Sequence, residues 1–115
     1  MSAFFFADKI SPGEPSIKVR AMLSFLSMEE GGRKTGAYSG YRPNHNFGEP
    51  SGREFYVGQI TFAPSETIKP GESREVDIEF LNGPGLMEAL QSGRAWRIQE
   101  GPTLVAMATL IDFVR

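Results

Sequence analysis

Hydrophobic and polar residues alternate over several short stretches of this chain. Between positions 17 and 27 the apolar residues stand two apart: Ile17, Val19, Ala21, Leu23 and Phe25. A second stretch alternates in the same way, with Glu75, Asp77 and Glu79 on one side and Val76, Ile78 and Phe80 on the other. A period of two places one set of side chains on each face of a strand. Both stretches are therefore predicted to be strands with one buried face.

Three further strands are predicted over residues 53–62, 94–99 and 104–114. The first has apolar residues on both faces, which indicates a partly covered strand or a bulge at Gly58. Residues 86–90 suit a short helical turn, and the Gly-rich residues 29–52 suit a long loop or an irregular hairpin. Five or six strands with almost no helix predict a small antiparallel barrel or sandwich.

Composition limits the remaining choices. The chain has 115 residues, no Cys, and 12 Lys plus Arg against 14 Asp plus Glu, for a net charge of −2. One domain is expected, disulfides and thiolate metal sites are excluded, and the charge argues against coating nucleic acid by bulk electrostatics. The chain also lacks the Gly-rich phosphate loop of a nucleotide-hydrolysing enzyme.

The N-terminal apolar run, Phe4 to Phe6, ends too soon at Asp8 and Lys9 for a signal peptide or a membrane span. We predict a soluble, cytoplasmic protein without membrane contact, since the lack of Cys fits a reducing compartment. The turn at residues 11–15 separates this run from the body. We expect the run to form a tail or an extra strand that docks on the domain.

Local chemistry concentrates between Gly31 and Gly48, which contain three cationic side chains, one His and no acid. Arg33 and Lys34 have the chemistry to meet phosphates, and Gly31-Gly32 lets the backbone approach a partner closely. The alternative is that Arg33 and Arg42 brace the loop, with Tyr41 packed beneath it, while Lys34 is solvated. Both interpretations are open at this point.

No group of residues in the sequence has the composition of a catalytic site. His45 is the only His, so neither a zinc site nor a Ser-His-Asp triad has enough members, and we predict no catalytic residue, metal or cofactor. The acidic residues Glu75, Asp77 and Glu79 are interpreted as a solvated sheet face, paired with Lys18 and Arg20. Trp96 is interpreted as core or rim packing.

Two loop motifs resemble a known family. Residues 26–35, Leu-Ser-Met-Glu-Glu-Gly-Gly-Arg-Lys-Thr, are followed by Tyr41-Arg42-Pro43. Together they resemble the start of the third domain of elongation factor Tu, where a Gly-Gly-Arg-His-Thr turn precedes Tyr-Arg-Pro-Gln. The resemblance continues through Pro70-Gly71 and Ile98-Gln99-Glu100-Gly101. It implies a six-stranded antiparallel Greek-key barrel over residues 17–115, preceded by a tail or extra strand over residues 1–16.

In the resembled domain these turns help to hold the T stem of aminoacyl-tRNA. The resemblance therefore implies a site that binds RNA or another partner, made of Arg33, Lys34, Thr35, Tyr41, Arg42, Asn44, Glu100 and Gly101. The chain departs from the family at Lys34, which replaces a His, and at Gln99 and Pro102-Thr103, which replace Arg and Gly-Arg. GTP hydrolysis is not implied, because only about sixteen residues precede the barrel.

Three functions are weighed. The first is an RNA-binding module that contacts tRNA through Gly31–Asn46 and the turn at Glu100. The second is a non-catalytic protein-binding module, a mimic, regulator or immunity-type protein whose partner is a protein of the translation machinery or a toxin. The third is a packing role in a larger assembly, with Phe4 to Phe6 as the contact. The loss of two positive charges from the last turn favours a protein partner.

Overall fold

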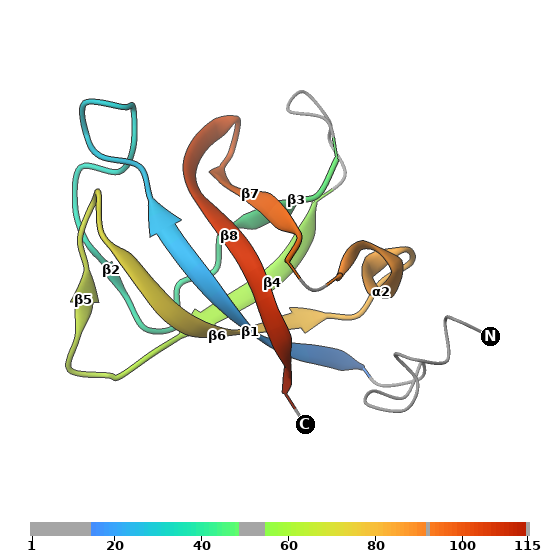
Figure 1. The fold of residues 1–115 in the computed structure, drawn as a ribbon. Coiled ribbons are helices and arrows are strands. Elements are labelled where there is room, and N and C mark those ends of the chain that lie inside the picture. Colours follow the sequence, from blue (N-terminus) through green and yellow to red (C-terminus); the bar gives the residue numbers. More distant parts are fainter. Residues whose placement is uncertain (1–14, 49–54, 92, 115) are drawn as a thin grey trace.

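A closed barrel of six antiparallel strands forms the body of the protein (Figure 1). The structure is a computed structural model that describes residues 15–48, 55–91 and 93–114. The barrel strands are β1 (Ser16–Phe25), β3 (Asn44–Asn46), β4 (Tyr56–Thr61), β6 (Ser73–Leu81), β7 (Ala95–Glu100) and β8 (Thr103–Val114). Their order is β1-β6-β4-β3-β7-β8, and β8 pairs with β1 to close the barrel.

The connections follow the Greek-key rule. Strands β3, β4 and β6 follow one another as a meander, and β1 lies beside β6 at the far side of that meander. The predicted all-β fold class and antiparallel Greek-key barrel are thereby confirmed. The Phe4 to Phe6 run and most of the predicted tail fall on residues 1–14, which lie outside the described residues.

Three short elements complete the fold. Strands β2 (Ala37–Tyr38) and β5 (Thr67–Ile68) pair into a small ribbon, and the helix α2 (Leu86–Ala89) lies between β6 and β7 in the chain. Leu86 and Leu90 are fully buried, so the helical turn predicted there packs against the core. The Gly-rich region predicted as a loop contains both β2 and β3, two strands that its composition conceals.

The alternation predicted along β1 and β6 holds throughout both strands. Their inward side chains are buried in the core. On the outer face, Arg20 donates to Glu75 at 2.9 Å and to Asp77 at 3.0 Å, and Lys18 lies opposite Glu79 in the register. The acidic side chains of β6 therefore form the charged outer face that the pattern indicates.

The prediction of a bulge at Gly58 is wrong. The register of β4 with β6 runs from Gly58↔Phe80 to Thr61↔Asp77 without a shift. Gly58 faces the barrel interior, where a Cβ atom at this position would come within 2.7 Å of His45 Nε2. Glycine is needed here because the histidine ring lies directly against the backbone.

His45 is fully buried and uses both ring nitrogens. The indole Nε1–H of Trp96 donates to Nδ1 at 3.0 Å, and Nε2 lies 3.1 Å from the carbonyl oxygen of Gly58. An indole N–H can only donate, so Nδ1 carries the lone pair and Nε2–H donates to Gly58. Burial lowers the pKa of His45 to about 4, although its hydrogen bond to the Gly58 carbonyl works in the opposite direction. His45 is thus a structural residue of the core.

Candidate functional site

Four of the residues predicted for the site meet in one cluster, which we call the Arg33 cluster: Arg33, Thr35, Tyr41 and Glu100. Arg33 and Thr35 lie in the loop after β1, Tyr41 forms an isolated bridge with Ile60, and Glu100 ends β7. The guanidinium of Arg33 and the hydroxyl of Tyr41 both donate to the same carboxylate oxygen of Glu100. The stretch from Arg33 to Tyr41 is therefore joined through one acid to a residue about 60 positions away.

The loop after β1 is held in place by its own turn. The backbone N–H of Ser27 donates to the Glu30 carboxylate at 2.8 Å, and that of Glu30 donates to the Ser27 hydroxyl at 3.2 Å. Gly32 is required, since a Cβ there would lie 2.4 Å from the carbonyl oxygen of Leu26. At the base of the loop, the N–H of Leu26 donates to the Val105 carbonyl at 2.9 Å, which ties the loop to β8 beside the β7–β8 turn.

Arg33 turns its donors towards the protein. Nε donates to the backbone carbonyl of Thr35 at 3.2 Å and Nη2 to that of Gly36 at 3.4 Å, while the guanidinium lies 4.9 Å from the ring centre of Tyr41. Burial opposes the positive charge, but the hydrogen bonds from Arg33 to Glu100 and Tyr41 outweigh it and raise the pKa of Arg33. This is the bracing arrangement, one of the two interpretations of Arg33 that the sequence leaves open.

Tyr41 packs beneath the guanidinium, 6.0 Å from the ring of Phe25 between ring centres. Burial and the hydrogen bond to Glu100 raise the pKa of the Tyr41 phenol well above its usual value near 10. The phenol is therefore a donor across the whole physiological range. A partner that needed the Nη1 donor of Arg33 or the hydroxyl donor of Tyr41 would therefore have to compete with Glu100.

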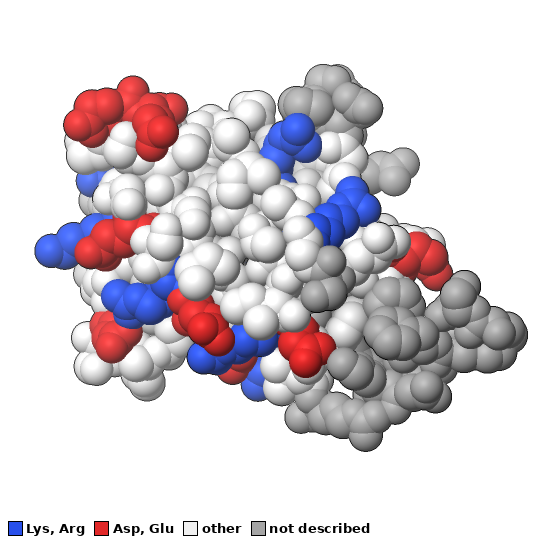
Figure 2. All heavy atoms as spheres, in the orientation of Figure 1, with Lys and Arg blue, Asp and Glu red and all other residues white. Residues whose placement is uncertain are grey.

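Lys34 and Gly101 are exposed beside this cluster, and Thr35 is its exposed member. Acidic side chains gather at the tip of the preceding loop, where Figure 2 shows a red group over the connection after β1 and where Glu29 and Glu30 are exposed. The segment Gly31–Gly48 itself contains no acid, yet the fold brings Glu100 onto Arg33 and places the acidic tip beside the loop. Its local positive charge is smaller than its sequence indicates.

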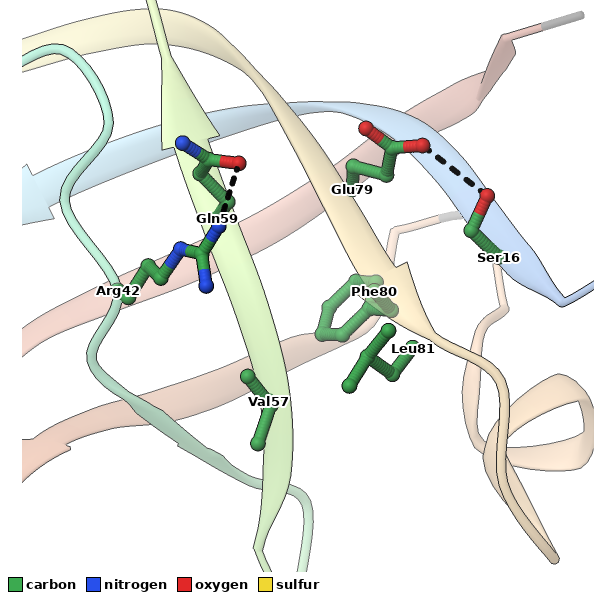
Figure 3. Close-up of a pocket in the computed structure, with 7 residues that line it drawn as sticks. All are labelled: Ser16, Arg42, Val57, Gln59, Glu79, Phe80 and Leu81. Carbon is green, nitrogen blue, oxygen red and sulfur yellow. Dashed lines mark hydrogen bonds between the residues drawn. The ribbon is translucent and has the colours of Figure 1, made fainter.

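Arg42 lies apart from this cluster, beside the outer face of β4, where its Nη2 donates to the Gln59 side chain at 3.5 Å. Asn44 lies in β3 between the two places, opposite Val57 of β4 and opposite Gln99 of β7, the residue before Glu100. Arg42 lines a shallow groove of about 200 Å³, the Arg42 groove, drawn in Figure 3. Its other lining residues come from β1, β4 and β6: Ser16, Val57, Gln59, Glu79, Phe80 and Leu81.

The predicted site residues thus separate into two places. The sequence analysis missed the apolar part of the Arg42 groove, where Val57 is 47% exposed and Leu81 is 63% exposed. The sequence did contain a signal for Leu81, because this residue occupies the next outward-facing position of β6 after Glu75, Asp77 and Glu79. An apolar residue at that phase faces solvent or a partner.

A comparison with models of known protein families finds none that matches this chain. Among the described residues, no three His, Asp or Glu side chains gather so that they could hold a metal ion. A search of the same residues for a helix both long and apolar enough to cross a membrane also finds none.

Proposed function

We propose that the protein is a non-catalytic binding module, similar to the third domain of elongation factor Tu, that acts by binding a protein partner linked to translation. The observation that carries the proposal is the engagement of Arg33 by Glu100. A phosphate at this turn would have to displace an internal carboxylate. The residue best suited to bidentate phosphate recognition is thus occupied.

The Arg42 groove supports a protein partner in a second way. Two exposed apolar side chains, Val57 and Leu81, lie on one side of the groove, beside the polar residues Arg42, Gln59 and Glu79. A protein interface commonly combines apolar side chains with polar neighbours of this kind. A surface for RNA would instead present cations and aromatic faces.

The link to translation rests on the resemblance of the two loop motifs to elongation factor Tu. A barrel that displays the same loops competes for proteins that recognise the third domain of that factor. The partner is then a protein of the translation machinery, or a toxin that docks on the factor. The module acts as a mimic, a regulator or an immunity-type protein.

Affinity capture with the full chain tests this proposal. The wild type, Leu81→Asp and a control, Ile111→Asp, are immobilised and exposed to a nuclease-treated lysate. Ile111 is also exposed, at 42%, but lies on β8, outside both loop motifs and the Arg42 groove. We expect the wild type and the control to retain a near-stoichiometric translation protein or toxin that Leu81→Asp loses. Recovery of no such protein, or equal recovery by all three, would overturn the proposal.

Binding of tRNA is the second candidate, favoured by the exposure of Lys34, Thr35 and Gly101. Filter binding against salt distinguishes it. If only Lys34 and Arg42 meet phosphates, the log–log slope is about −2, and Glu100→Gln should steepen it by about one by freeing Arg33. A steep slope with submicromolar affinity for wild type would favour RNA over protein.

A further inference from the structure

We propose that the Arg42 groove is covered by the chain's own N-terminal segment, residues 4–10, whose phenylalanines pack on Val57 and Leu81. The segment then acts as a cover that a protein partner must displace. The displacement by a partner rests on the proposed function, whereas the docking of the segment does not.

The groove has an apolar floor on a face that is otherwise polar. The β4–β6 register, Gly58↔Phe80, places Val57 next to Leu81 across the two strands. The next outward pair along the same strands is Gln59↔Glu79, and after it comes Thr61↔Asp77. Val57 and Leu81 are thus a pair of exposed apolar side chains at one end of a polar face, which is the kind of surface that a covering segment buries.

The chain outside the described residues ends at the rim of this groove. Ser16 lines the groove and lies opposite Leu81, and the carbonyl of Pro15 accepts the N–H of Asn82 at 3.0 Å. Val57 lies two strand spacings from Ser16, which is roughly 10 Å. The ten or so residues from Phe6 to Ser16 reach roughly 33 Å when extended, so Phe4 to Phe6 can fold back over the groove. The Pro- and Gly-containing residues 11–15 suit such a reversal.

The charges of the segment complement those of the groove. The segment carries Asp8 and Lys9 directly after its phenylalanines. The groove offers a cation of its own, Arg42, whose bond to Gln59 is long at 3.5 Å, and an anion, Glu79. Three aromatic residues followed by one acid and one base complement an apolar pair that lies beside one base, Arg42, and one acid, Glu79, which also accepts the Ser16 hydroxyl at 3.0 Å.

Disulfide trapping tests the docking, since the chain has no cysteine of its own. The first variant carries Ala7→Cys and Gln59→Cys, which leave the phenylalanines, Val57 and Leu81 in place. The control carries Ala7→Cys and Val114→Cys. Val114 lies opposite Lys18 on β8, directly beside β1, whereas Gln59 lies at the same level along β1 but two strands away. A tether without docking would therefore favour the control.

We expect the intramolecular disulfide to Gln59→Cys to form at least about tenfold faster than that to Val114→Cys, given millimolar effective concentrations for a tethered segment. Replacing Phe4, Phe5 and Phe6 with Ser should abolish the difference. Equal rates, a faster control, or a disulfide between two chains would overturn the proposal. Trapping without any captured protein would leave the docking intact and refute the proposed function alone.

Discussion

Acidification should destabilise the barrel through His45. In the folded chain the ring is neutral, with Nδ1 accepting the indole N–H of Trp96 and Nε2–H donating to the Gly58 carbonyl. Protonation at Nδ1 would place its N–H against the indole N–H of Trp96, so two hydrogen-bond donors would face each other in a core that excludes water. The unfolded chain has no such restriction, so it binds the proton more readily than the folded chain.

The size of the effect follows from the two pKa values. The ordinary pKa of 6.5 applies to the unfolded chain, and burial lowers the value to about 4 in the folded one. This difference corresponds to about 3 kcal/mol of stability. Because the folded pKa is depressed, the full contribution is present above pH 6.5, declines as the pH falls towards 4, and is gone below the folded pKa.

Urea unfolding followed by tryptophan fluorescence measures this loss directly. Trp96 is the only tryptophan, so the signal comes from the partner of His45 itself. The free energy of unfolding is measured at several values between pH 7.5 and 4. The slope should approach about 1.4 kcal/mol per pH unit in the middle of this range, the limit for one proton.

The matched control is His45→Gln, which cannot titrate. It is expected to be less stable at neutral pH by about 1–3 kcal/mol, since the Trp96 N–H loses its acceptor or keeps a poorer one. Its stability should then change little between pH 6.5 and 5. Carboxylates contribute equally to both proteins and titrate mainly below this range. Parallel pH profiles of wild type and His45→Gln would refute the reasoning.

Three further outcomes are expected. Gly58→Ala should lower the free energy of unfolding by about 1–3 kcal/mol, because its methyl group would meet the histidine ring, whereas Gly48→Ala, with its nearest neighbour 3.7 Å away, should change it little in the same urea assay. In a spectrophotometric alkaline titration, Tyr41 should ionise well above the usual pKa of a phenol, and Tyr41→Phe should remove that late step, because burial and Glu100 raise the pKa of Tyr41. Arg20→Met should cost no more than about 1 kcal/mol, since its ion pairs lie on the surface; a larger loss by thermal unfolding would contradict this.

The barrel could be predicted from the sequence because two of its long strands, β1 and β6, carry a clear period of two. Strand β8 also contributes to the core, but its residues 104–108 are all apolar and do not alternate. Strand β3 could not be found in this way. Its three residues, Asn44 to Asn46, are all polar, and only the pairing with β4 and β7 makes them a strand. The hydrogen bond from the Trp96 indole to the buried His45 forms only when the barrel closes, so no local sequence pattern predicts it.

Prediction of the candidate site from the sequence is limited in a different way. A cationic residue in a loop looks the same in a sequence whether its counter-ion is a phosphate outside the protein or a carboxylate inside it. Arg33 and Glu100 are 67 positions apart, and only the closure of the barrel brings them together. Val57 and Leu81 became a common surface for the same reason, through the register of β4 with β6.

The loop after β1 therefore has a structural use that needs no RNA. Glu100 joins this loop to the last hairpin, and Arg33, Tyr41 and Glu100 fix one another. An ion pair this exposed contributes only about 1 kcal/mol, a factor of about five in affinity for a competing ligand. Glu100 alone thus weakens phosphate binding without forbidding it. The turn that follows Glu100, Gly101-Pro102-Thr103, carries no cation that would offset this factor, whereas a partner that contacted Val57 and Leu81 would not have to displace Glu100.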